Sequence, residues 1–399
     1  MREPAAGRWA EISPDPDARW TVVTRRSASS ALMSLAMSLE RLVADRTPVE
    51  PSRVHPRDGF GAVSAETVSA PADVPAHPTA SRDGWAVAFA TIAGASQTSP
   101  VVLPQAPRWV EAGEALPAGT DTVLPPEAIE AGTGREVIAD AAPGEGCAGI
   151  GSELGRGTRI IRAGDRVGSL GLLALGHSGV HEIAVRAPRV ALLACRDDQH
   201  LHVLQPIVAA LVTSAGCQVI LAGSAPDGPD GLARALADAP HRADAVFVLG
   251  GTGMGHRDQS AAALAEAGTL AAHGIALRPG ETAGFGDIGG CPVLLLPGRP
   301  DATISAFVAL GRPLLRRLCG HNEEEPAVVA PLRRKLSSPL GVSELVFVRR
   351  VGNGIEPLGS AGTPLHRLLE AEGTILVPPD REGYPEGRTV EMTPLWTIR

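Results

Sequence analysis

The strongest constraint on the fold is a regular alternation of apolar and helical segments between residues 188 and 320. Strands that alternate with helices at this spacing form βαβ units, in which helices cover both faces of one sheet. We therefore predict an α/β domain over residues 188–322, with three layers and a mainly parallel sheet. Its strands are expected at Arg189–Ala194, Gln218–Ala222, Ala245–Leu249 and Val293–Leu296, and its helices at Val203–Ser214, Pro229–Ala237, Gln259–Ala267 and Ala302–Leu318.

The flanking segments have a different pattern. A serine-capped helix is expected within residues 28–45, where leucines recur at helical spacing. Residues 71–150 and 326–399 contain short Val/Leu segments between glycines and prolines, which is typical of small β-rich units. We predict an N-terminal extension (1–27), a helical and extended domain (28–70 and 151–187), a β-rich domain (71–150) and a small C-terminal β-barrel (326–399).

Composition argues against several classes of function. The chain carries 36 Lys+Arg against 44 Asp+Glu, and this acidic balance disfavours nonspecific binding to nucleic acid. No apolar run reaches the ~18 to 20 residues of a membrane span, and the first residues lack a secretory pattern. The five cysteines are scattered without a CxxC motif. We expect a cytoplasmic protein with reduced thiols and with neither a membrane nor a nucleic acid as partner.

A glycine loop, GGTGMG, follows the expected strand at Ala245–Leu249. Glycines permit positive φ and close backbone approach, and successive N–H groups near a helix start bind anions. The alternative is a tight turn without a ligand, but a position at the carboxyl end of a strand favours binding. The candidate binding residues are Gly250, Gly251, Gly253 and Gly255.

A second loop, LPGRP, follows the next parallel strand and leads into a long helix. Because parallel strands end at the same edge of a sheet, the two loops are expected side by side, as a site for an extended polyanionic small molecule. Arg278 lies between them in the sequence, and it either holds an oxyanion there or is a solvated side chain. The candidate residues of the second loop are Pro297, Gly298, Arg299 and Pro300.

Several carboxylates are also expected at the ends of strands. Asp197, Asp198, Asp227 and Asp258 could ligate Mg²⁺ together, although helix N-capping also explains such aspartates. The nearby HxH pair, His200 and His202, has no third ligand in view and favours a surface turn over a metal site.

The order of the motifs is similar to that of a known family. TASRDGWAVA at 79–88 resembles SAMDGYAV, and AGEALPAGTDTVLPPE at 112–127 resembles TGAPLPxGADAVVxxE. LGGTGMGHRD, ALRPGET and LPGRP resemble SGGxSxGxxD, KPGKP and LPGNP, and the resemblance extends over residues 30–395. The chain thus resembles the molybdopterin molybdenumtransferase family of bacterial MoeA and the gephyrin C-terminal domain.

This resemblance implies four subdomains, an elongated homodimer, and a site between the α/β domain of one chain and the β-rich domain of the other. It implies Mg²⁺-dependent insertion of molybdenum from molybdate into adenylylated molybdopterin, with release of AMP. Further partners would be a molybdopterin adenylyltransferase or a client molybdoenzyme. By motif, it implies catalytic roles for Asp83, Glu127, Asp198 and Asp258, metal binding by Asp198, Asp227 and Glu153, and cofactor binding by the two glycine loops and Arg278.

The chain also departs from the family pattern. The lysine pair of KPGKP is replaced by Arg278 and Glu281, and the asparagine of LPGNP by Arg299. A carboxylate at Glu281 should weaken the binding of phosphate or molybdate, while Arg299 could restore a cation from the neighbouring loop. Two functions therefore remain open: an active transferase, or a catalytically impaired homologue that acts as a carrier of the molybdenum cofactor or as an assembly scaffold. A related enzyme with another nucleotide-like substrate is a third reading.

Overall fold

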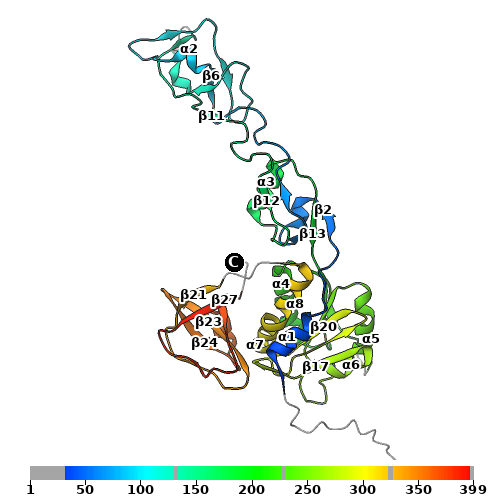
Figure 1. Cartoon of the computed structure of the whole chain (residues 1–399). Coiled ribbons are helices and arrows are strands. Elements are labelled where there is room, and N and C mark those ends of the chain that lie inside the picture. Colours follow the sequence, from blue (N-terminus) through cyan, green and yellow to red (C-terminus); the bar gives the residue numbers. More distant parts are fainter. Residues whose placement is uncertain (1–31, 130–133, 227–229, 322–326, 396–399) are drawn as a thin grey trace, which may run out of the picture.

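The computed structural model describes residues 32–129, 134–226, 230–321 and 327–395. The chain is elongated: the α/β unit and the C-terminal β unit lie side by side at one end, and a β-rich unit forms the tip of an arm at the other (Figure 1). Among the described residues, no helix has the length and apolar character that a membrane crossing requires.

The central sheet has six strands in the order β15-β14-β16-β20-β19-β17. The first four are parallel, as predicted, and the last two add an antiparallel edge that the sequence analysis missed. Those edge strands are short and contain glycine and histidine, so they lack the apolar runs that mark buried strands. The strands are β14 (Arg189–Ala194), β15 (Gln218–Ser224), β16 (Ala245–Leu249), β17 (Thr269–His273), β19 (Gly284–Ile288) and β20 (Cys291–Leu296).

Helices cover both faces of this sheet, which gives the three predicted layers. One face packs Leu192, Phe247 and Leu294 into a core shared with α4, α7 and α8, and the other packs Leu193 and Val248 against α5 and α6. Burial on both faces explains why these strands are apolar throughout. The helices are α4 (Gln199–Ser214), α5 (Gly231–Asp238), α6 (Ser260–Ala267), α7 (Pro300–Ala306) and α8 (Arg312–Cys319), with a π-helical turn (Phe307–Gly311) between the last two.

The N-terminal helix α1 (Leu35–Val43) is capped by Ser34, whose side chain accepts a hydrogen bond from the Met37 N–H. The sequence analysis groups this helix with residues 50–70. In the structure, Leu35 and Leu42 instead belong to the large core of the α/β unit and lie against α8. An amphipathic helix needs an apolar partner surface, and α8 provides one.

The C-terminal unit is a small barrel. Its strands pair in the order β24-β23-β25-β27-β21, and a bridge between Leu332 and Ile355 returns to β24. β23 also pairs in parallel with β18 (Ile275–Arg278), which pairs with β1 (Met33–Ser34). The barrel is therefore joined to the α/β unit through one sheet. Its elements are β21 (Val328–Pro331), β22 (Leu336–Ser337), β23 (Ser343–Val351), β24 (Gly354–Gly359), α9 (Leu365–Leu368), β25 (Gly373–Val377), β26 (Gly383–Tyr384) and β27 (Thr389–Pro394).

The arm has two parts. Its inner part contains α3, the small sheet β2-β13-β3 and one short strand pair, and its tip contains the sheet β8-β6-β9 with two short strand pairs beside it (Figure 1). The inner elements are β2 (Ser52–Val54), a 3₁₀ turn (Pro56–Gly59), β3 (Val63–Ser64), β4 (Val68–Ser69), β12 (Arg159–Ile161), α3 (Ser169–His177) and β13 (Ile183–Arg186). The tip contains β5 (Thr79–Ala80), β6 (Gly84–Val87), α2 (Phe89–Ile92), β7 (Val101–Val102), β8 (Arg108–Val110), β9 (Thr122–Leu124), a 3₁₀ turn (Pro126–Ala128), β10 (Glu136–Val137) and β11 (Cys147–Ala148).

The core of the α/β unit gives a direct stability prediction. Phe247 of β16 is fully buried and makes an edge-to-face contact with Phe307, with 6.0 Å between the ring centroids. Phe247→Ala should lower the free energy of unfolding by about 3 to 5 kcal/mol, because it leaves a cavity that the sheet cannot close. Denaturant titration measures this loss. Phe60→Ala, at a side chain that is 62% exposed, is the matched control and should cost less than about 0.5 kcal/mol.

Candidate functional site

The loops that follow β14, β16 and β20 meet at one edge of the central sheet, as the sequence predicts. They surround a cavity of about 470 Å³. This is the position at which open α/β sheets bind ligands. The lining residues are Arg196, Asp198, His200, Leu201, Gly250, Gly251, Thr252, Gly253, Asp258, Glu281, Thr282, Pro297, Gly298, Arg299 and Ala302.

The glycine loop has a backbone that other residues would not permit. Gly250 and Gly251 have φ of 77° and 65°. A Cβ at Gly250 would lie 2.8 Å from Leu201 Cδ2, and one at Gly251 would lie 2.7 Å from Ser260 Oγ. Ser260, the first residue of α6, donates from Oγ to the Gly250 carbonyl at 2.7 Å. The hydrogen bond from Ser260 fixes the loop, and the space at the Cβ positions of Gly250 and Gly251 is too small for a side chain.

The same loop offers unused hydrogen-bond donors. Within the described part of the chain, the N–H groups of Gly251, Thr252 and Gly253 donate to no protein acceptor. Thr252 is only 3% exposed, and Gly251 is buried as well. Buried N–H groups are rarely left without an acceptor, and a row of them beside a cavity is suited to an anion.

Asp258 fixes the far side of the loop. Its Oδ2 accepts the Gly255 N–H at 2.9 Å, and a Cβ on Gly253 would lie 2.6 Å from the same oxygen. Asp258 lines the cavity, whereas Gly255 does not. Asp258 therefore has a structural task in addition to any role toward a ligand.

Asp198 caps α4. Its Oδ1 accepts the His200 N–H at 2.9 Å, and Arg196 Nε lies 3.4 Å from its Oδ2. The bond from the His200 N–H is the main cause that lowers the pKa of Asp198 below its ordinary value, and Arg196 adds to the effect. The N-capping alternative is thus confirmed for Asp198, and the side chain also lines the cavity.

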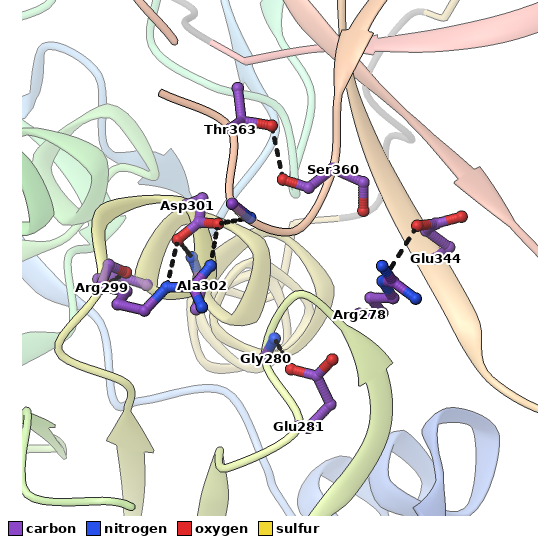
Figure 2. Close-up of polar contacts among 11 residues, drawn as sticks. Arg278, Gly280, Glu281, Arg299, Asp301, Ala302, Glu344, Ser360 and Thr363 are labelled. Carbon is purple, nitrogen blue, oxygen red and sulfur yellow. Dashed lines mark hydrogen bonds and ion pairs between the residues drawn. The ribbon is translucent and has the colours of Figure 1, made fainter. Parts of the chain in front are cut away.

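Arg299 lines the cavity but is already paired. Its Nε and Nη2 lie 3.2 and 2.5 Å from the two carboxylate oxygens of Asp301, and this hydrogen-bonded pair raises the pKa of Arg299 (Figure 2). Glu281 also lines the cavity, and its carboxylate accepts the Gly280 N–H at 3.1 Å. Within the described residues, Arg299 and Glu281 form no ion pair.

Arg278 does not line this cavity. Its Nε lies 3.4 Å from Oε1 of Glu344 on β23, so it bridges the α/β unit and the barrel (Figure 2). The Arg278 side chain is 44% exposed, as the solvated alternative expects, and Glu344 is an ion-pair partner that the sequence analysis did not predict. Pro300, the first residue of α7, is likewise absent from the lining, whereas Pro297 and Gly298 are part of it.

Three of the other predicted site residues lie on the arm. Asp83 Oδ1 accepts the Ala112 N–H at 2.8 Å in the turn before β6, and the exposed Glu127 lies in the 3₁₀ turn after β9. Glu153 is exposed between β11 and β12, and Asp227 lies outside the described residues. One chain therefore brings Asp198 and Asp258 together without Asp83, Glu127 or Glu153. The described segments contain no group of three His, Cys, Asp or Glu side chains arranged for a metal ion.

Several residues that line the cavity were not predicted as site residues, among them His200, Thr252 and Thr282. His200 Nε2 lies 2.8 Å from the Gly298 carbonyl and joins two of the loops, while His202 bonds Asp197, so the two histidines do not form a shared site. Thr252 and Thr282 share a hydrogen bond of 3.0 Å between their hydroxyls. Both threonines lie within motifs that the sequence analysis names, Thr252 in GGTGMG and Thr282 in ALRPGET, and this was the available signal.

Comparisons with known proteins agree with this geometry. The profile of the MoeA N-terminal region (domain I and II) matches residues 30–179, and that of a probable molybdopterin binding domain matches residues 196–317. A putative molybdopterin biosynthesis protein of Methanocaldococcus jannaschii is 27% identical over 366 residues, covering 84% of this chain and 90% of that protein. Molybdopterin molybdenumtransferase 2 of Mycobacterium tuberculosis is 26% identical over 361 residues, covering 80% and 89%.

Solved structures show the same likeness. The crystal structure of a molybdopterin biosynthesis MoeA protein from Pyrococcus horikoshii is 26% identical, with a TM-score of 0.70 over 92% of this chain and all of that one. The two profiles include both the arm and the cavity, and they occur in the order that the sequence motifs indicated. In its motifs, its fold and these matches together, the chain is similar to the MoeA family over both the arm and the α/β unit.

Proposed function

We propose that this protein acts in molybdenum cofactor biosynthesis, as an enzyme that binds adenylylated molybdopterin, inserts molybdenum from molybdate and releases AMP. The observation that carries the proposal is the row of N–H groups at Gly251, Thr252 and Gly253, which have no acceptor among the residues that the structure describes. Neutral donors fixed by the fold bind a phosphate without any change in side-chain conformation. The volume of about 470 Å³ suits a small-molecule ligand.

The cavity's side chains complete such a site. Arg196 and Arg299 place guanidinium groups at its rim, where they can contact phosphate oxygens. Asp198 and Asp258 supply carboxylate oxygens, and this donor set fits Mg²⁺, which is usually bound by one or two carboxylates together with substrate phosphates. Bound there, Mg²⁺ would offset the negative charge of the phosphates.

A second copy of the chain would supply the remaining carboxylates. Asp83 and Glu127 lie at the tip of the arm, far from the cavity of the same chain (Figure 1). The inner arm also exposes large apolar side chains on α3, with Leu170 80% and Leu173 57% exposed. A helix that is apolar all round is normally covered, and a homodimer through the arm would cover it.

The direct experiment is to mix purified protein with adenylylated molybdopterin, Mg²⁺ and molybdate and to measure AMP by chromatography. We expect release of AMP that depends on molybdate. Omitting molybdate and, separately, omitting protein are the controls. If the complete mixture releases no AMP, the protein does not have the transferase activity.

The charges in the cavity favour one alternative, a homologue that binds the pterin as a carrier or scaffold without transferring metal. Asp198, Asp258 and Glu281 face only two guanidinium groups, and each guanidinium is within 3.4 Å of a carboxylate oxygen. Such a cavity attracts a multiply charged substrate less strongly than one lined by free cations. Binding of the pterin without AMP release would support this second function.

The charge at Glu281 can be tested separately. Glu281→Lys should strengthen the binding of inorganic phosphate at least about tenfold, because a repulsive charge at the cavity becomes an attractive one. Calorimetry in low salt measures the affinity. Glu391→Lys changes the net charge equally at an exposed position of β27 and should leave the affinity unchanged. Equal affinities in both variants would place the bound anion outside this cavity.

Sharing of the site between subunits predicts complementation. Asp83→Ala and Arg299→Ala should each lose AMP release as homodimers. In co-expressed dimers, random pairing gives half heterodimers with one intact site each, so roughly a quarter of the wild-type rate should return. Differently tagged chains allow the heterodimer to be purified and assayed. A purified heterodimer as inactive as its parents would contradict a site made by two chains.

A further inference from the structure

Asp301 is a buried carboxylate whose oxygens are fully used. It is the second residue of α7 and is 3% exposed. Its Oδ1 accepts from Arg299 Nε at 3.2 Å and from the Ala302 N–H at 2.9 Å. Its Oδ2 accepts from Arg299 Nη2 at 2.5 Å and from the Gly362 N–H at 2.7 Å. Figure 2 shows this arrangement beside the loop that carries Glu281.

The two bonds to Arg299 fix the plane of its guanidinium group. The side chain of Arg299 is 63% exposed, whereas that of Asp301 is 4% exposed, so the arginine faces the cavity and the aspartate lies behind it. Two parallel N–H···O bonds hold a guanidinium in one orientation, and the N–H groups of Nη1 remain for a ligand. The carboxylate also offsets part of the positive charge that a ligand would meet.

The bond to Gly362 connects this pair to the barrel. Gly362 belongs to the loop between β24 and α9, and Thr363 stabilises that loop by donating to the Ser360 carbonyl at 2.6 Å. The pair Arg278–Glu344 crosses the same boundary, and the Glu344 side chain is only 6% exposed. The Asp301 carboxylate thus accepts hydrogen bonds both from a loop of the barrel and from an arginine that faces the cavity.

We propose, building on the function proposed above, that Asp301 is a positioning residue that holds Arg299 over the cavity and moderates its charge, so that a phosphate group binds reversibly. Without this carboxylate, Arg299 would present its full charge to the anion. The phosphate would then bind more tightly and leave more slowly. A purely structural role would have the opposite consequence, because a loosened loop weakens every contact with the ligand.

The experiment measures inorganic phosphate binding to the full chain by calorimetry, without Mg²⁺. Asp301→Asn keeps the shape and removes the charge, and it should lower the dissociation constant by about fivefold or more. Asp244→Asn is the matched control: Asp244 holds Arg189 by the same two-bond contact, at 3.2 and 3.1 Å, but at the opposite end of β16. That control should leave the dissociation constant for phosphate unchanged.

A second background tests whether Asp301 acts through Arg299. Arg299→Gln should weaken phosphate binding, and adding Asp301→Asn to it should then change little. The proposal is overturned if Asp301→Asn weakens binding or leaves it unchanged, or if it tightens binding equally without Arg299. If Asp301→Asn does not fold, Arg299→Gln provides the test. Unchanged phosphate binding in that variant would exclude Arg299 as a ligand and would overturn the proposal.

Measuring AMP release distinguishes a failure of this inference from a failure of the proposed function. If the wild type releases AMP, Asp301→Asn should lower both KM for the pterin and kcat, because tighter binding slows release. A purely structural loss would raise KM instead and would overturn the inference. If the wild type releases no AMP, the transferase proposal fails, while the phosphate measurements still decide the role of Asp301.

Discussion

The geometry of the cavity depends on the packing of β14, β16 and β20 between two layers of helices. Because both faces of these strands are buried, their register is fixed: Ala194 pairs with Leu249, and Leu249 with Leu296. The ladder continues for one more step, as Cys195 donates to the Leu249 carbonyl and Gly250 to that of Leu296. The three loops therefore leave the sheet at the same level, and this places their backbone groups around one space.

The sequence was sufficient for what depends on local pattern. The bounds of β14 and β16 follow from apolar runs, and the glycine loop follows from its place after β16. Charge partners could not be predicted, because they depend on tertiary packing. Arg278 meets Glu344, and Asp301 meets Gly362, each across more than sixty residues of sequence. The edge strands β17 and β19 escaped prediction because pairing, and not hydrophobicity, makes them strands.

The cavity combines two kinds of anion-binding group that differ in the free energy needed to place them at the site. Backbone N–H groups are neutral and need no counterion, whereas each arginine here comes with its own carboxylate, Asp198 for Arg196 and Asp301 for Arg299. Each pairing offsets the charge of the arginine it involves, at side chains that are 38% exposed for Arg196 and 63% exposed for Arg299. At the positions of the family's lysine pair the chain has Arg278, which pairs with Glu344, and Glu281, so the two guanidinium groups of the cavity come from other positions, Arg196 and Arg299.

The parallel pairing of β18 with β23 has a consequence for how the molecule unfolds. Backbone hydrogen bonds run without a break from β1 through β18 into the barrel, and the large core contains Leu345 and Phe347 of β23 beside residues of the α/β unit. Two regions that the sequence analysis assigns to separate domains thus share both a ladder and an apolar interior. We expect these two regions to unfold as one cooperative unit, whereas most apolar side chains of the arm lie in small cores of its own.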